Sequence, residues 1–305
     1  MTGIRLAPGV TVVAVPGRGA AVRTADGEFL RVATGDVPVA DLLDRLSGDG
    51  ADAPDTADGE PEPALARLLG AFAAAGYTRT GDAPGPPRDR WPARLRTVWL
   101  LGDAVLTEPL GDCLRRAGAA PRPAAPGEVA ALVREAAPGG DGRPAAVVWC
   151  LDGPVPAGLW DDADRLPALG VAWLRCHREG RQLWLEPPAV APGDVTAAQV
   201  RLRRLAATPA HRELAAYWAG ERVTGDDRFT TPASAALAAA LLTADLADWA
   251  TGARGTGEAA APAAPGALPA RRRLRRVDLR GLTVTEHPVL PVPDVAPLPA
   301  PRGAA

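Results

Sequence analysis

The chain has 305 residues, a formal charge of −2 at pH 7 and three cysteines. This length accommodates two domains of ordinary size, and the near-neutral charge excludes a strong general attraction to nucleic acid or to an anionic membrane. The chain contains no lysine, which excludes Walker-type phosphate loops, Schiff-base enzymes and protein kinases, because each of these requires an ammonium group at a set place.

Targeting and cysteine signals are weak. The first residues, MTGIRLAPGV, do not combine a basic patch with a long apolar run, so we expect no secretory signal. The longest apolar stretch, Ala233 to Leu242, is followed closely by Asp245 and Asp248 and is too short to span a bilayer. The cysteines show no CxxC spacing, which disfavours a disulfide framework. We therefore expect a cytoplasmic protein with no membrane partner.

The first eighty residues predict a small strand-and-helix module. Three β-type runs at 10–15, 20–24 and 28–32 are separated by Gly-rich turn signals. A helix follows from about Asp36 to Gly48, and a second runs from about 62 to 75, with leucines on one face. The acidic segment between them, at 48–60, suits a solvated loop. Together these elements predict a winged-helix unit with a three-stranded sheet.

This module resembles the recognition element that binds leader peptides in the biosynthesis of ribosomally made, modified peptides. The resemblance covers roughly residues 4–80 and rests on LAPGVTVVAVPGRGAAVRTADGEFLRV, VADLLDRLSG and ALARLLGAFAAAGYTR. It implies that a leader peptide adds as an extra strand beside the third strand and packs against the last helix. Physically, an unpaired strand edge supplies backbone donors and acceptors, while an apolar groove supplies selectivity.

The expected peptide-binding residues lie on that strand and on that helix. They are Glu28, Phe29, Leu30, Arg31 and Val32 on the strand, and Leu65, Leu68, Leu69 and Phe72 on the helix. The sequence does not divide the four helix residues between core and groove. Because leader peptides of this family are commonly acidic, Arg23 and Arg31 are candidates for steering them, although a solvated strand position is the favoured interpretation of each.

A Pro- and Gly-rich linker at 81–95 leads to a second domain at 96–305. Apolar runs predict strands at 97–102, 145–151, 171–176 and 182–185. Helices are expected at 106–117, 128–137, 159–169 and 232–251, and an Ala-, Pro- and Gly-rich flexible insert at about 252–270. This alternation is typical of an α/β fold with a mainly parallel sheet and helices on both faces.

The second domain resembles a degenerate ThiF-like domain, the ubiquitin-activating type of adenylate-forming fold. The resemblance rests on VWLLGDAVLTEPLGDCLRRAGA, on GVAWLRCHREGRQLWLEPPAVAPGDVTAAQVRLRRLAA and on RRVDLRGLTVTEHPVLPVPDVAPLP. Active members place GxGxxG after their first strand, whereas here Gly102 is followed by Asp103 and by larger residues. A carboxylate at this turn repels phosphate, so we expect no nucleotide cofactor there.

Members of this family also often hold a structural zinc with two CxxC pairs. The matching positions here are Ala198 and Arg201, then Val295 and Leu298. We therefore expect no metal. His177, His211 and His287 lie far apart in the sequence and are expected at the surface or in packing roles.

No catalytic residues are expected elsewhere. The carboxylate pairs 161/162, 226/227 and 245/248 lack a histidine or cysteine neighbour and are expected to be solvated charges. The three cysteines fall in a helix and in apolar strands, where cysteine is usually a small buried hydrophobe. The basic run RRRLRR at 271–276 either contacts an acidic leader or an enzyme, or is a solvated loop end.

We therefore expect a non-catalytic partner protein that binds a precursor's leader and presents its core to a separate YcaO-type cyclodehydratase. The family resemblance implies this enzyme, which forms azolines in thiopeptide or related azole pathways. An adenylate-forming or nucleotide-using enzyme with a displaced phosphate site remains an alternative, as does an assembly protein without a peptide ligand. The sequence leaves the oligomeric state open, a homodimer included.

Overall fold

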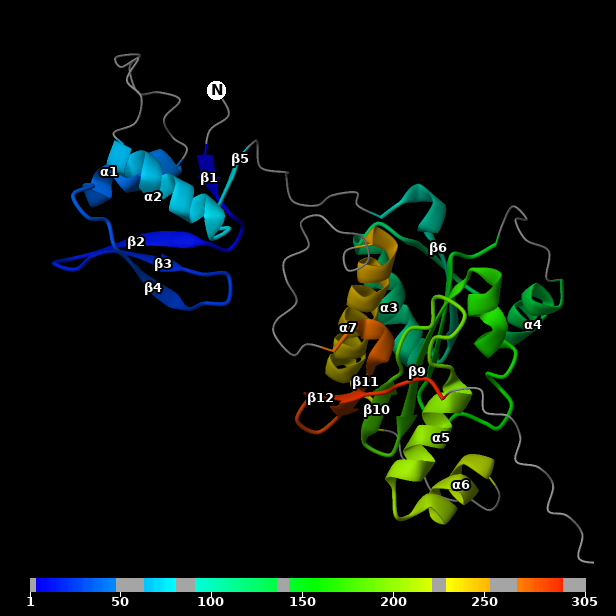
Figure 1. The fold of residues 1–305 in the computed structure, drawn as a ribbon. Helices are drawn as coiled ribbons and strands as arrows, with labels where there is room; N and C mark the ends of the chain where they lie inside the picture. The colour runs from blue at the N-terminus through cyan, green and yellow to red at the C-terminus, as the bar shows by residue number, and fades with distance from the viewer. Residues whose placement is uncertain are drawn as a thin grey trace, which may run out of the picture. The chain divides into compact units, whose positions relative to one another are not determined.

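The computed structural model describes residues 4–47, 63–80, 91–135, 143–220, 229–252 and 268–292. The chain divides into two compact units, Met1–Pro87 and Arg88–Ala305 (Figure 1). The acidic segment at 48–60 and the core of the insert expected at 252–270 lie outside the described residues.

The first unit is a three-stranded antiparallel sheet with two helices and a short strand pair. Its elements are β1 (Ile4–Leu6), β2 (Thr11–Val15), β3 (Gly19–Arg23), β4 (Phe29–Val32), α1 (Val39–Ser47), α2 (Pro63–Ala74) and β5 (Thr78–Thr80). The sheet order is β2-β3-β4, so β4 is an edge strand. The three predicted strands and both predicted helices are confirmed. The antiparallel pair β1–β5 was not predicted.

One face of the sheet is buried under the two helices (Figure 1). Val22 on β3 packs with Leu42 and Leu46 of α1 and with Leu69 and Phe72 of α2. Strand side chains alternate between the two faces of a sheet, and residues paired across neighbouring strands lie on the same face. The buried face therefore contains Val12, Val22, Leu30 and Val32, as the cross-strand register shows.

The second unit is built on a seven-stranded sheet in the order β12-β11-β10-β9-β8-β6-β7. Its strands are β6 (Thr97–Gly102), β7 (Ala120–Pro123), β8 (Ala146–Leu151), β9 (Ala172–Glu179), β10 (Gln182–Leu185), β11 (Arg273–Asp278) and β12 (Thr283–Pro288). Its helices are α3 (Ala104–Arg116), α4 (Pro126–Glu135), α5 (Ala197–Ala207), α6 (His211–Ala219) and α7 (Pro232–Thr251), with 3-10 turns at Ala93–Leu95, Ala163–Leu169 and Ala270–Arg272.

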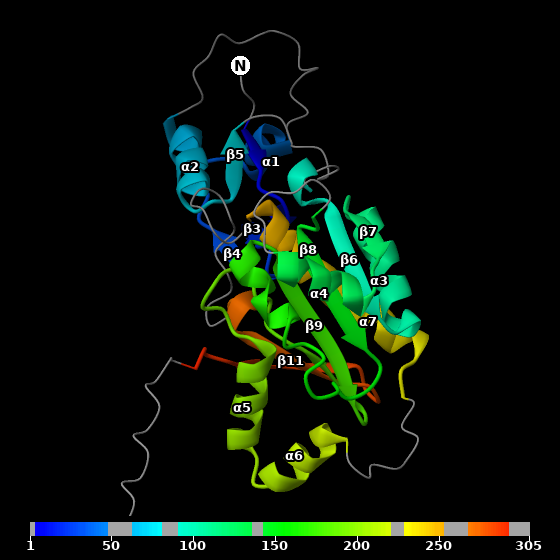
Figure 2. The ribbon, with the colours of Figure 1, turned by 90° about the vertical axis from the view of Figure 1, so that its right-hand side faces the viewer.

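A separate core lies on each face of this sheet. On one face, leucines of α3 and alanines of α7 pack against Val98, Val148 and Leu174. On the other face, α4 and the Ala163–Leu169 turn cover a second core that contains several tryptophans. Figure 2 shows α4 in front of the strands and α7 behind them. The fold is therefore a three-layer α/β arrangement, as expected.

Three sequence-based expectations for this unit were wrong in detail. The sheet is mixed, because only β7-β6-β8-β9 are parallel and the remaining neighbours are antiparallel. The helix expected at 159–169 is a 3-10 turn at Ala163–Leu169, which contains Pro167 and ends at Gly170. Residues 91–95, expected in the linker, belong to the larger unit, since Trp91 is buried in its core.

The basic run at 271–276 is neither a loop nor a free cationic patch but mostly strand β11. Arg273 and Arg275 both bond the carboxylate of Asp245 on α7. Arg271 bonds Asp194, and among the arginines of the strand only Arg276 is exposed. Asp245, expected as a solvated charge, is instead a buried counter-ion. The ion pairs of Arg273 and Arg275 therefore hold the antiparallel half of the sheet against α7.

Among the described helices, α7 alone has the length and hydropathy that a bilayer crossing requires. Its alanines and leucines pack into the core against α3, and Asp245 forms buried ion pairs from its middle. These contacts account for its apolar composition as that of a core helix.

Candidate functional site

Strand β4 exposes apolar side chains at a sheet edge that pairs with no other strand among the described residues; we call this the free edge of β4. Phe29 is 65% exposed and Leu30 is 42% exposed, although both belong to a regular strand. Arg31 is also exposed, and Val32 is half-buried against the core. An exposed edge with large apolar residues invites pairing with another extended segment.

The direction of the backbone groups on β4 follows from the hairpin that precedes it. The amide of Thr24 donates to the carbonyl of Glu28 across a turn in which Gly27 has a φ of +88°. In an antiparallel pair, hydrogen-bonded and non-hydrogen-bonded positions alternate from that point. The backbone groups of Leu30 and Val32 therefore face β3, whereas those of Phe29 and Arg31 face the free edge.

The structure places the four helix residues in two different environments. Leu69 and Phe72 are core residues, 5% and 4% exposed. Leu65 and Leu68 are half-buried and pack against the same core from α2. Leu65 and Leu68 thus retain surface for a ligand, while Leu69 and Phe72 hold the helix in place.

The two arginines of the sheet, Arg23 and Arg31, lie on the same face. Phe29 pairs with Arg23 and Arg31 pairs with Ala21, so Phe29 and both arginines lie on the face away from the helices. No strand residue on that face of β2, β3 or β4 is acidic. Glu28, next to the strand, precedes Leu30 by two residues and therefore has the parity of the helix-covered face.

The turn after β6, where the resemblance to ThiF-like domains implies a phosphate site, carries exposed residues that make contacts within the chain. A Cβ on Gly102 would lie 1.7 Å from the carbonyl oxygen of Cys150, so strand packing alone requires this glycine. The Asp103 carboxylate accepts the amide of Asp152 at 2.6 Å, and the Asp152 carboxylate pairs with Arg178. Asp103 is the N-cap residue of α3, and an acidic side chain at this position disfavours a phosphate group there.

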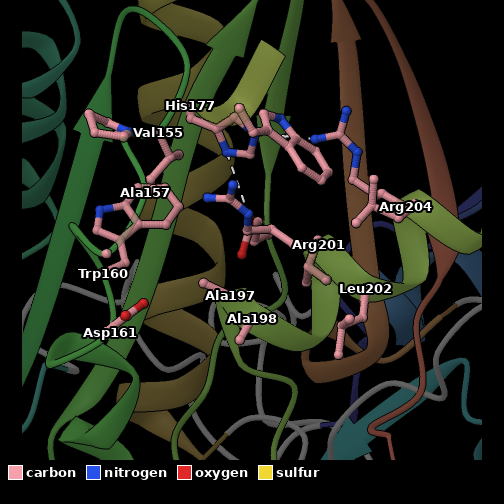
Figure 3. A pocket seen from close by; sticks show the side chains of 16 residues that line it. Val155, Ala157, Trp160, Asp161, His177, Ala197, Ala198, Arg201, Leu202 and Arg204 are labelled. Atoms are coloured by element: carbon pink, nitrogen blue, oxygen red, sulfur yellow. Dashed lines mark hydrogen bonds and ion pairs between the residues drawn. The ribbon is translucent and has the colours of Figure 1, made fainter. Parts of the chain in front are cut away.

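A cavity of about 380 Å³ lies between the loop after β8 and helix α5. Trp160 and Asp161 come from the loop, and Ala198 and Arg201 come from α5, with His177 of β9 between the two sides (Figure 3). The Arg201 guanidinium lies 4.7 Å from the ring centroid of Trp218. Of the groups that line this cavity, Glu186 is paired with Arg175 and Arg204 is paired with Glu179.

The buried polar groups beside the cavity form a network. Burial alone would raise the pKa of Glu179, but hydrogen bonds from His177 and Arg204 outweigh it and hold that pKa well below its ordinary value. Trp218 also donates its indole N–H to Glu179 at 2.6 Å. His177 lies 3.6 Å from Glu186 through Nδ1. Sequence reasoning placed no functional weight on these residues, since their partners are distant in the chain.

Ala198 and Arg201, the positions where the ThiF-like resemblance implied a first zinc-binding pair, do not fit a metal. Ala198 has no ligating atom, and Arg201 is a cation that stacks on Trp218. Within the described ranges, no three histidine, cysteine, aspartate or glutamate side chains converge as a metal site. Val295 and Leu298 lie outside those ranges. Cys150 and Cys176 are buried neighbours on β8 and β9, and their contact and burial raise the pKa of Cys176.

No protein-family model and no curated protein matches this chain. The fold nevertheless matches solved structures. The heterocyclase TruD aligns over 95% of this chain with a TM-score of 0.56 and 16% identity, and Escherichia coli MccB aligns over 95% with a TM-score of 0.54 and 10% identity. The chain spans 42% of the TruD chain but 95% of the MccB chain. The similarity therefore establishes a shared fold.

Proposed function

We propose that this chain is a non-catalytic peptide-binding protein of an azole-forming pathway. It binds the leader of a ribosomally made precursor as a strand beside β4 and presents the core peptide to a separate YcaO-type cyclodehydratase. The free edge of β4, with Phe29 and Leu30 exposed, is the observation that carries this proposal. Strand addition to such an edge is a recurrent mode of peptide recognition.

Two further observations support the proposal. The fold is shared with the heterocyclase TruD and with a heterocyclase solved in complex with substrate and cofactor, the latter at a TM-score of 0.55 and 14% identity. In addition, the turn at Gly102 carries the carboxylate of Asp103, which accepts the amide of Asp152. The shared fold supports a role in an azole-forming pathway, and the carboxylate of Asp103 disfavours nucleotide chemistry at this turn.

The proposal is tested by removing one edge donor without removing the strand. Arg31→Pro deletes an N–H that faces the free edge, a position where proline is tolerated in sheets. Arg31→Ala is the matched control, because it removes the side chain and keeps the N–H. We expect Arg31→Pro to weaken binding of a fluorescein-labelled leader peptide about tenfold relative to Arg31→Ala, since it loses a hydrogen bond and hinders neighbouring pairs.

A second control addresses the other edge of the same sheet. By the alternation that runs through β3, the backbone of Ala14 faces the free edge of β2. Ala14→Pro should therefore leave leader affinity unchanged. Equal losses in Arg31→Pro and Ala14→Pro would contradict strand addition at β4, as would an Arg31→Pro protein that binds as well as Arg31→Ala. Circular dichroism spectra of all three variants are the check that each is folded.

A nucleotide-using function is the second candidate, and the cavity beside α5 is the observation that favours it. Arg201 points a guanidinium with no carboxylate partner among the described residues into a space lined by Trp160 and Trp218 (Figure 3). A phosphate group could bind this cation and a base could contact the indoles. Calorimetric titration with ATP and magnesium tests this function, and micromolar binding that Arg201→Gln abolishes would replace the non-catalytic proposal.

A further inference from the structure

The two sides of β4 offer a bound strand two different chemistries. Residues directly opposite each other in neighbouring strands project from the same face of a sheet, whether the strands are parallel or antiparallel. A peptide that pairs with β4 therefore places alternate side chains beside Leu30 and Val32, and the others beside Phe29 and Arg31. This division depends only on the register of β4 and holds for either peptide direction.

The helix-covered side is apolar. Leu30 is 42% exposed there and Val32 is half-buried, and Leu65 and Leu68 of α2 pack against the same core. The nearest charge with this parity is Glu28, a carboxylate. Peptide side chains on this side gain by burying apolar surface, and an acidic side chain here would meet Glu28.

The outer side is cationic. Arg31 lies on the edge strand β4, two residues after Phe29, and Arg23 lies on β3 directly opposite Phe29. Both guanidiniums are exposed and no strand residue of this face is acidic. A carboxylate that projects from the peptide on this side meets Arg31 as a cross-strand neighbour, and its own methylene groups can contact Phe29.

Resting on the proposed function, we infer that the segment taken by β4 alternates apolar and acidic residues. The apolar residues lie opposite Leu30 and Val32, and the acidic residues lie opposite Phe29 and Arg31. The peptides that bind are thus defined by the alternation of apolar and acidic residues along the strand, and not by their acidity or hydrophobicity alone. A segment with the same composition but a different order cannot place both kinds of side chain on their matching faces.

Two synthetic peptides of equal composition test the alternation with the full chain. One consists of Leu-Glu repeats, and the other repeats the block Leu-Leu-Glu-Glu; both carry fluorescein on a Gly-Ser spacer, and binding is read by fluorescence anisotropy at low salt. We expect the alternating peptide to bind at least about tenfold more tightly, because the block order forces carboxylates onto the apolar side. A Leu-Lys repeat should bind more weakly than the Leu-Glu repeat.

Charge reversal at the edge strand provides the second arm. Arg31→Glu should weaken the Leu-Glu repeat about tenfold and strengthen the Leu-Lys repeat, whereas Arg5→Glu on β1, also exposed, should change neither. A preference for Leu-Glu that Arg31→Glu does not alter would overturn the assignment of the acidic side chains to the outer face.

The outcomes separate this inference from the proposed function. If the alternating and block peptides bind equally, and a leader peptide still loses affinity in Arg31→Pro, the alternation is wrong and strand addition at β4 stands. If the leader peptide also binds independently of Arg31→Pro, the proposed function fails and the inference falls with it. If only the alternating peptide binds, and Arg31→Glu reverses the charge preference, the inference is supported.

Discussion

Asp245 is predicted to hold the antiparallel half of the large sheet to α7. Its carboxylate bonds Arg275 through both oxygens, with Oδ1 3.0 Å from Nη2, and it bonds Arg273 Nη2 at 2.9 Å. All three side chains are at most 10% exposed. Asp245→Ala would leave two buried guanidiniums with Glu286 as their remaining partner, at 3.3 and 3.4 Å.

Breaking a buried ion pair from one side costs about 3–5 kcal/mol, because the other charge stays buried without compensation. Glu286 is partly exposed and offsets some of this cost, so we expect about 3 kcal/mol for Asp245→Ala. For a unit of this size, that loss lowers the melting temperature by roughly 6–12 °C. Differential scanning calorimetry of the full chain measures the shift, and Asp245→Asn serves if the alanine variant does not accumulate.

Asp112→Ala is the matched control for this prediction. Asp112 pairs with Arg115 on α3, and both side chains are more than half exposed. A surface pair of this kind contributes about 0.5 kcal/mol or less. If Asp245→Ala destabilised the protein no more than Asp112→Ala, the buried network would not be what fastens β11 to α7.

Three other predictions concern the packing and the buried carboxylate. Gly102→Ala should prevent folding of the larger unit, because the new Cβ overlaps the Cys150 carbonyl oxygen. Gly127→Ala is the control and should fold normally, because no atom lies within 4 Å of its Cβ position. Soluble yield and calorimetry compare the two variants. Leu69→Ala should lower the free energy of unfolding by about 2–4 kcal/mol, and Leu68→Ala should lower it less. For the same loss of stability, Leu68→Ala should weaken leader binding more than Leu69→Ala does. The pKa of Glu179 is lowered in the folded protein, so its carboxylate contributes fully to stability above its ordinary pKa of 4.5 and progressively less as the pH falls below that value. Denaturant titrations across pH 3–6 should therefore show that the free energy of unfolding falls more steeply with decreasing pH in the parent than in Glu179→Gln.

The parts of the fold that local pattern determines were predictable from sequence. The turn glycines and alternating runs gave β2, β3 and β4, and the apolar spacing gave α2. The helix α7 was expected with the observed bounds; Thr231 caps it, Pro232 is its first residue and Gly252 ends it. Strand β7 was missed because two of its four residues are prolines, which sheets accept at an edge.

What was missed depends on partners far apart in the chain. The run that contains β11 looks cationic and solvent-exposed until Asp245 on α7 neutralises Arg273 and Arg275. The network of Glu179 likewise draws Arg204 from α5 and Trp218 from α6. In the candidate peptide site, the sequence identified the strand but could not separate Leu65 and Leu68 from Leu69 and Phe72, because helical spacing places all four on one broad face.

Hydrogen–deuterium exchange of the full chain with and without a leader peptide tests the central claim most directly. Peptide binding beside β4 should slow exchange in the segment 28–33, where the amides of Phe29 and Arg31 face the free edge of β4. The β2 edge and the larger unit should exchange as before. Protection confined to residues 88–305, with unchanged exchange in 28–33, would contradict binding of the peptide on β4.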